Sequence, residues 1–141
     1  MIKPNKKFMQ LAIEEAKKAQ KEHDYAIGAI VVKDNKVISS SSSRSKRDEN
    51  PIAHGETLSI IKASKLLKSR HLLGCVLYTT NEPWPMCASL MVWARMQGVV
   101  YRRRWRRRRR GDLLPSLPRR DGPRRLTTAA NAHQWLKGPV D

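Results

Sequence analysis

The sequence predicts an α/β protein, a three-layer α/β/α sandwich around a central mixed sheet, followed by an irregular C-terminal tail. Three observations support this prediction. Amphipathic helical patterns alternate with short β-branched runs, one apolar run has the length of a buried strand, and the pattern stops near residue 102. A chain of 141 residues suits one hydrophobic core. We therefore predict a folded domain over residues 1–102 and an Arg-rich, largely disordered or non-native tail over residues 103–141.

The first half of the domain is predicted as a helix, a β-hairpin and a loop. Residues 5–22 place apolar side chains near a 3.6-residue period between Lys and Glu, which is typical of an amphipathic helix. Residues 26–39 contain two β-branched runs around Asp34 and Asn35, so they predict a hairpin. Residues 39–50 are polar and aperiodic, and we expect a surface loop there.

The second half is predicted as helix, strand, helix and strand. A helix begins near residues 51–54 and continues to about Leu67, with one apolar side. Residues 75–80, "CVLYTT", form a short and nearly continuous apolar run of the kind found in buried strands. Residues 99–102 predict the last strand, which a right-handed crossover makes parallel to the run at 75–80.

The helix between these two strands is expected to be buried. Pro85 suits its first turn, and Gly98 is expected to end it. Because "MCASLMVWARM" is apolar nearly all round, we expect Met86 and Trp93 in the core. Cys75, at the start of the buried strand, is predicted to be a core residue as well.

Two short motifs carry residues that suit a metal site. "AHGE" places His54 and Glu56 two residues apart at one predicted helix start, and "EPWPMC" places Cys87 at the next. Helices that follow strands begin near the edge where α/β folds build ligand sites, so we expect these side chains to converge. A helix N-terminus also lowers the pKa of a thiol and favours the thiolate, which is the form that binds metal.

These residue types point to zinc chemistry. A catalytic zinc site has three protein ligands and an open position for water, whose pKa the metal lowers to about 7. His54 and Cys87 suit the ligand role, and Glu56 is placed to shuttle protons. The signature of zinc deaminases is H-x-E followed by P-C-x-x-C. This chain matches it at His54, Glu56, Pro83 and Cys87, and has Trp84 at the first Cys position.

The chain resembles the cytidine/deoxycytidylate deaminase superfamily in two stretches, "NPIAHGETLSIIKA" and "LYTTNEPWPMCASLMVWAR". The resemblance is to the branch of guanine, fungal-type cytosine and tRNA adenosine deaminases, over about residues 5–101. It implies hydrolytic removal of an exocyclic amine from a nucleobase or nucleoside. It also implies Zn²⁺ bound by His54 and Cys87, Glu56 as the catalytic acid and base, and a homodimer.

The resemblance further implies substrate contacts from Ser43 and Ala53, although Ser43 stands where relatives often carry an Asn that hydrogen-bonds the base. Trp84 is the main departure, because an indole N–H only donates and cannot bind a metal. The loss of a zinc ligand should cost more than the roughly 10–100-fold of an outer-shell change. We therefore predict weak or absent zinc and impaired deamination. If Glu56 replaces the missing ligand, the proton shuttle is lost.

The charge is unevenly distributed along the chain. The formal net charge is +17, of which residues 1–101 contribute +7 and residues 102–141 contribute +10. The first part is rich in Lys and the second in Arg, which favours a frameshift, a fusion or a vector-derived end. The Arg run could bind RNA phosphates, with Trp105 stacking on a base, or it could be a solvated tail with no selected role.

Two other classes of function stay open beside the enzyme. One is a catalytically inactive pseudoenzyme that keeps the fold, and the other is a nucleic-acid-binding protein that acts through the Arg-rich tail. No apolar run reaches the roughly 18 residues of a membrane-spanning helix, and the N-terminus lacks the apolar core of a secretory signal. We therefore expect a cytoplasmic protein with no membrane partner. Its two cysteines are expected to be reduced.

Overall fold

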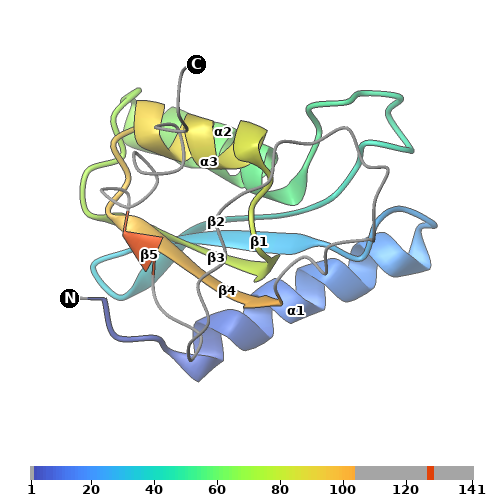
Figure 1. Ribbon diagram of the computed structural model, residues 1–141, viewed down its shortest axis with the longest axis horizontal. Coiled ribbons are helices and arrows are strands. Elements are labelled where there is room, and N and C mark those ends of the chain that lie inside the picture. Colours follow the sequence, from blue (N-terminus) through green and yellow to red (C-terminus); the bar gives the residue numbers. More distant parts are fainter. Residues whose placement is uncertain (1, 104–126, 129–141) are drawn as a thin grey trace, which may run out of the picture.

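A computed structural model describes residues 2–103 and 127–128 of the chain, and it has the predicted three layers (Figure 1). Helix α1 (Lys6–Lys21) covers one face of the sheet. Helices α2 (Gly55–Leu67) and α3 (Pro85–Trp93) lie side by side on the other face. The α/β/α prediction is confirmed.

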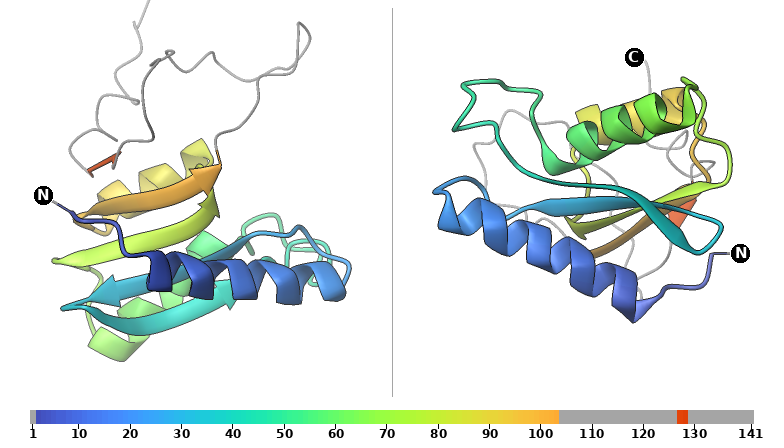
Figure 2. Two further views of the ribbon diagram at one scale, coloured as in Figure 1. Left: turned by 90° about the horizontal axis from the view of Figure 1, so that it is seen from below. Right: turned by 180° about the vertical axis from the view of Figure 1, so that it is seen from behind.

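The sheet is mixed, with strand order β2-β1-β3-β4-β5. Strand β1 is antiparallel to both β2 and β3, whereas β3 and β4 are parallel, as predicted for the strand–helix–strand unit. The left view of Figure 2 shows the strands side by side, with α1 crossing in front of them. The strands are β1 (Gly28–Lys33), β2 (Lys36–Ser42), β3 (Cys75–Asn81), β4 (Gly98–Arg103) and β5 (Thr127–Thr128).

The β1–β2 hairpin forms at the predicted turn. Asp34 and Asn35 have φ angles of 49° and 59°, which is the left-handed pair that a two-residue hairpin turn of the type I′ class requires. The expectation of a loop beginning at residue 39 was wrong, because β2 continues to Ser42. Backbone pairing with β1 extends through these serines, and the Ser39 hydroxyl donates to the carbonyl of Ser59 in α2 at 2.8 Å.

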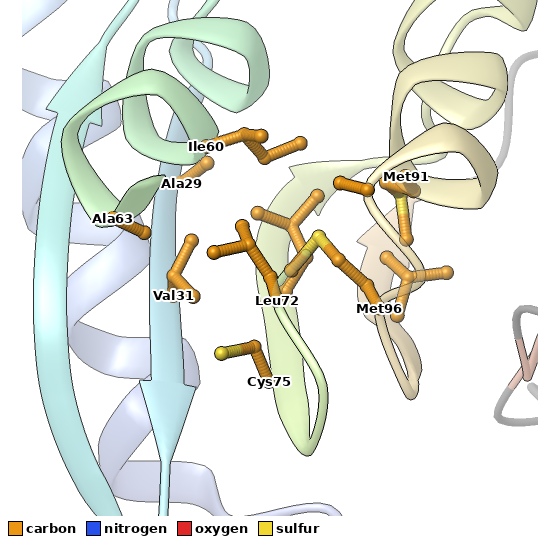
Figure 3. Close-up of a cluster of buried hydrophobic side chains, with 11 residues drawn as sticks. Ala29, Val31, Ile60, Ala63, Leu72, Cys75, Met91 and Met96 are labelled. Atoms are coloured by element: carbon orange, nitrogen blue, oxygen red, sulfur yellow. The ribbon is translucent and has the colours of Figure 1, made fainter. Parts of the chain in front are cut away.

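The core lies on both faces of the sheet. Between the sheet and helices α2 and α3, aliphatic, Met and Cys side chains from β1, β3 and the two helices pack together (Figure 3). On the α1 side the cluster is smaller, and the rings of Phe8 and Tyr78 meet edge to face at 5.4 Å between centroids. Cys75 is fully buried in the larger cluster, as predicted.

The expectations for α3 need correction. The helix ends at Trp93, before the left-handed residue Arg95, and Gly98 is the first residue of β4 rather than the end of the helix. Trp93 is 80% exposed and Met86 is 37% exposed, so neither is a core residue. Only the side of α3 that faces the sheet and α2 is covered in the described part of the chain. Apolar composition therefore did not reveal which side is buried.

Most of the predicted tail lies outside the described residues, including Trp105 and the Arg run from residue 104 onward. The described parts are Arg103, at the end of β4, and Thr127–Thr128, which pair with Gly98 and Val99 to add β5 to the sheet. Nucleic-acid binding by the tail stays a prediction. In the part of the chain that the structure describes, no helix has both the length and the apolar character needed to cross a membrane.

Candidate metal and catalytic site

The structure brings His54, Glu56 and Cys87 together at one edge of the sheet. His54 is the residue before α2, Glu56 lies in the first turn of α2, and Cys87 lies in the first turn of α3. One ligand atom from each of the three lies within 4.8 Å of the others, and Cys87 Sγ is 3.6 Å from His54 Nδ1. Two motifs separated by about 30 residues thus form one cluster.

His54 is held by the backbone geometry at the start of α2. Its N–H donates to the Thr57 hydroxyl at 3.1 Å, and the Leu58 N–H donates to the His54 carbonyl at 3.0 Å. Gly55 lets this helix start approach the sheet closely. A Cβ there would lie 3.2 Å from the carbonyl oxygen of Ser41 in β2 and 3.3 Å from that of Ile27. The small residue in the middle of "HGE" thus positions the two larger ones.

Glu56 is a buried carboxylate with one free oxygen. The residue is 1% exposed, its Oε1 accepts a hydrogen bond from Thr79 Oγ1 at 3.1 Å, and its Oε2 has no partner among the described residues. Burial raises the pKa of Glu56, against the opposing effects of a backbone hydrogen bond, the Thr79 hydroxyl and His54. An unpaired buried oxygen is uncommon in a folded protein, and it marks Glu56 as a group available for chemistry.

Cys87 is fully buried, and the expected lowering of its pKa is not seen. Burial raises the pKa of this thiol, and the negative charge of Glu56 raises it further. The helix N-terminus therefore does not outweigh desolvation when no cation is present. A thiolate at this position requires a positive charge beside it, which a metal ion supplies.

Trp84 occupies the backbone position expected for the missing cysteine. It is the residue before α3, it is half-buried, and its carbonyl accepts a hydrogen bond from the Ala88 N–H at 2.9 Å. The helix start is thus retained although the ligand is changed. The third potential ligand in the cluster is the Glu56 carboxylate.

The donor set fits zinc. Imidazole nitrogen, thiolate sulfur and carboxylate oxygen are all common zinc ligands, and here they lie within reach of one ion. The unpaired Glu56 Oε2 adds to this fit, because a cation or its bound water would satisfy it. Only His54 and Cys87 remain as ligands if Glu56 is kept for proton transfer.

The two residues expected to contact the substrate lie in the loop between β2 and α2. Ser43 is buried, and its hydroxyl donates to Asp24 Oδ1 at 2.9 Å. Ala53 is buried beside His54, and its carbonyl accepts a hydrogen bond from the Arg44 N–H at 2.9 Å. Their roles as substrate contacts stay predictions. Sequence reasoning missed Asp24, because a single Asp before a strand reads as an ordinary turn residue.

Comparisons with known proteins identify the family of this chain. A family model described as "Cytidine and deoxycytidylate deaminase zinc-binding region" matches residues 2–103. The tRNA-specific adenosine deaminase of Aquifex aeolicus (strain VF5) is 36% identical over 94 residues, which are 67% of this chain and 62% of the relative. The guanine deaminase of Bacillus subtilis (strain 168) is 40% identical over 74 residues, which are 52% of this chain and 47% of the relative.

A solved structure supports the same relationship. The X-ray structure of guanine deaminase from Bacillus subtilis superposes with a TM-score of 0.69 and 32% sequence identity. The match covers 72% of this chain and 66% of that one. The chain spans about three fifths of the length of the Aquifex relative and about half of the Bacillus one. With its zinc-binding-region match over most of its length, the chain belongs to the cytidine and deoxycytidylate deaminase family.

Proposed function

We propose that this protein is a zinc-dependent deaminase of a nucleobase or nucleoside, with a metal site weakened by the loss of one ligand. The convergence of His54, Glu56 and Cys87, with a buried and unpaired Glu56 oxygen, carries this proposal. His54 and Cys87 would hold the zinc. When bound, the zinc would supply an activated water as the nucleophile.

Glu56 has the geometry of the proton shuttle. Thr79 fixes Oε1, which leaves Oε2 to take a proton from the attacking water and to deliver it to the departing amine. A carboxylate whose pKa is raised by burial suits both steps. It is a stronger proton acceptor than an exposed carboxylate, and it is still acidic enough to release the proton again. The products would be a carbonyl at the ring carbon and ammonia.

The relatives suggest a purine as the substrate. One is named a tRNA-specific adenosine deaminase and another a guanine deaminase, and each name specifies a purine with an exocyclic amine. The formal charge of +7 over residues 1–101 favours an RNA substrate over a free base, since phosphates attract a basic surface. Adenosine in tRNA is therefore the first substrate to test, and guanine is the second.

A catalytically inactive deaminase-fold protein is the alternative that one observation favours. Trp84 removes a thiolate at the start of α3, and an indole offers no lone pair to a metal. Such a protein would keep the sheet and helices and would bind a base or a partner without chemistry. The homodimer, the cytoplasmic location and RNA binding through the tail stay predictions.

Zinc content measured on the natural chain and on Trp84→Cys tests the proposal. We expect the natural chain to hold well below one zinc per subunit and Trp84→Cys to hold about one, since the variant completes three ligands. The rate of deamination of a tRNA anticodon stem-loop, measured as ammonia release or inosine formation, should rise with the zinc content. We expect an increase of at least about 100-fold.

Two controls distinguish a restored ligand from other effects. Trp84→Ala opens the same space without a thiolate and should not gain zinc. Trp93→Cys adds a cysteine to the exposed side of the same helix and should not gain zinc either. If Trp84→Cys holds zinc but deaminates none of tRNA adenosine, guanine and cytosine, the protein is a binding protein in this fold and the enzymatic proposal is wrong.

A further inference from the structure

Asp24 is a buried carboxylate that the deaminase motifs do not explain. It lies between the end of α1 and the start of β1, and its side chain is completely inaccessible. A charged side chain is costly to bury unless hydrogen bonds replace its water. The partners of Asp24 therefore indicate what the residue stabilises.

Those partners belong mainly to the loop between β2 and α2. Asp24 Oδ1 accepts from the Ser43 hydroxyl at 2.9 Å and from the Tyr25 N–H at 2.8 Å. Oδ2 accepts from the backbone N–H groups of Lys46 at 3.1 Å and Arg47 at 3.0 Å. Burial alone would raise the pKa of Asp24, but these hydrogen bonds prevail and lower it, so the carboxylate is charged at neutral pH.

The same loop continues to the metal site through its own backbone hydrogen bonds. The Arg44 N–H donates to the Ala53 carbonyl at 2.9 Å, and the Ala53 N–H donates to the Asn50 carbonyl at 3.1 Å. The His54 N–H donates to the Ile52 carbonyl at 2.8 Å. Figure 2 shows this loop at the end of the molecule where α1 finishes. Hydrogen bonds from Asp24 to Ser43 and from Arg44 to Ala53, with the intervening peptide bonds, thus connect Asp24 to the residue before α2.

We propose that Asp24 is a positioning residue, which holds the loop of residues 43–53 so that Ala53 and His54 keep the arrangement that receives the substrate. This inference rests on the proposed function. It also changes the part played by Ser43. Because Asp24 already accepts a hydrogen bond from the Ser43 hydroxyl, Ser43 anchors the loop and does not donate to the base.

Asp24→Asn tests the proposal without changing the size of the side chain. The new amide nitrogen would face N–H donors of the loop, which it cannot accept from. Asp48→Asn is the matched control, since Asp48 lies in the same loop, is exposed, and forms its ion pair with the Arg44 guanidinium. Both changes are made in the Trp84→Cys protein and assayed at a temperature where each variant is fully folded.

Two readouts separate positioning from stability alone. We expect Asp24→Asn to raise KM for the anticodon stem-loop about tenfold while kcat changes less than about threefold, with zinc content unchanged. We expect trypsin to cleave after Arg44, Lys46 and Arg47 at least about tenfold faster, as identified by mass spectrometry. Asp48→Asn should change neither readout beyond about twofold.

The outcomes are distinct. If Asp24→Asn matches Asp48→Asn in both readouts, Asp24 does not hold the loop and the proposal is wrong. If cleavage rises but KM and kcat stay constant, Asp24 holds the loop, but the loop does not position Ala53 and His54 for the substrate. That result also overturns the proposal. If the Trp84→Cys protein is inactive, the proposed function fails separately, and the cleavage rates still show whether Asp24 fixes the loop.

Discussion

Replacing Glu56 by Gln in the Trp84→Cys protein should remove deamination and at the same time stabilise the fold. Gln keeps the shape of the side chain but cannot shuttle a proton, so kcat should fall roughly 10²–10⁴-fold, the contribution expected of a general acid and base. The fold should gain about 1 kcal/mol, because a buried carboxylate with an unpaired oxygen becomes neutral. Ammonia release and urea unfolding measure the two effects.

The stabilising effect should depend on pH in one direction. Since burial raises the pKa of Glu56, the folded metal-free protein keeps this proton at pH values where the unfolded chain has released it. The folded state therefore loses stability as pH rises above the ordinary value of 4.5, until the folded pKa is passed. Glu56→Gln has no such loss. Its stability advantage, measured by urea midpoints in EDTA, should be small near pH 4 and larger at pH 7.

Glu14→Gln supplies the control for this experiment. Glu14 is exposed on α1, so its replacement should leave both kcat and the pH dependence of stability nearly constant. An active Glu56→Gln protein would show that another group moves the protons. A stability difference that shrinks toward pH 7 would contradict the raised pKa.

Gly28→Ala should be more destabilising than the same change at Gly55 or Gly74. A Cβ at Gly28 would lie 2.2 Å from the Ala12 carbonyl oxygen and 2.4 Å from the Ala16 backbone nitrogen. These are backbone atoms of α1 and cannot move without the helix, so α1 must shift away from β1. We expect a loss of about 3 kcal/mol or more in the free energy of unfolding, measured by urea denaturation.

Gly74→Ala is the matched control, because the added methyl group there meets backbone strain and no steric clash. Gly74 has a φ of 75° and open space around its missing Cβ. Alanine there meets left-handed backbone strain without a clash, and the cost should be about 1 kcal/mol. Equal losses for the two variants would mean that α1 yields easily, and would contradict the close packing of α1 on β1.

The local patterns of the chain were sufficient for most of the fold. Helical periodicity predicted α1 and α2, the Asp34–Asn35 pair predicted the hairpin turn, and the apolar run at 75–80 predicted β3. The motifs around His54 and Cys87 predicted a cluster because helices in such folds begin at a common edge. Each of these signals depends on residues that are near one another in the chain.

Where prediction failed, the deciding contacts join distant parts of the chain. Ser39 belongs to β2 because it pairs with β1 and bonds to α2. Trp93 is exposed because the buried side of α3 is the one that carries Cys87, Ala88 and Met91.

The chemistry of the site divides in the same way. Residue types and spacing were enough to single out His54, Glu56 and Cys87. The raised pKa values of Glu56 and Cys87 arise from burial, which only the packed layers produce. Asp24 had no local signal, because its partners other than the Tyr25 N–H are about 20 residues further along the chain. They meet Asp24 only when the β2–α2 loop folds back over the end of α1. Local patterns thus determine elements and ligand types, and tertiary contacts determine exposure, charge and the support of the site.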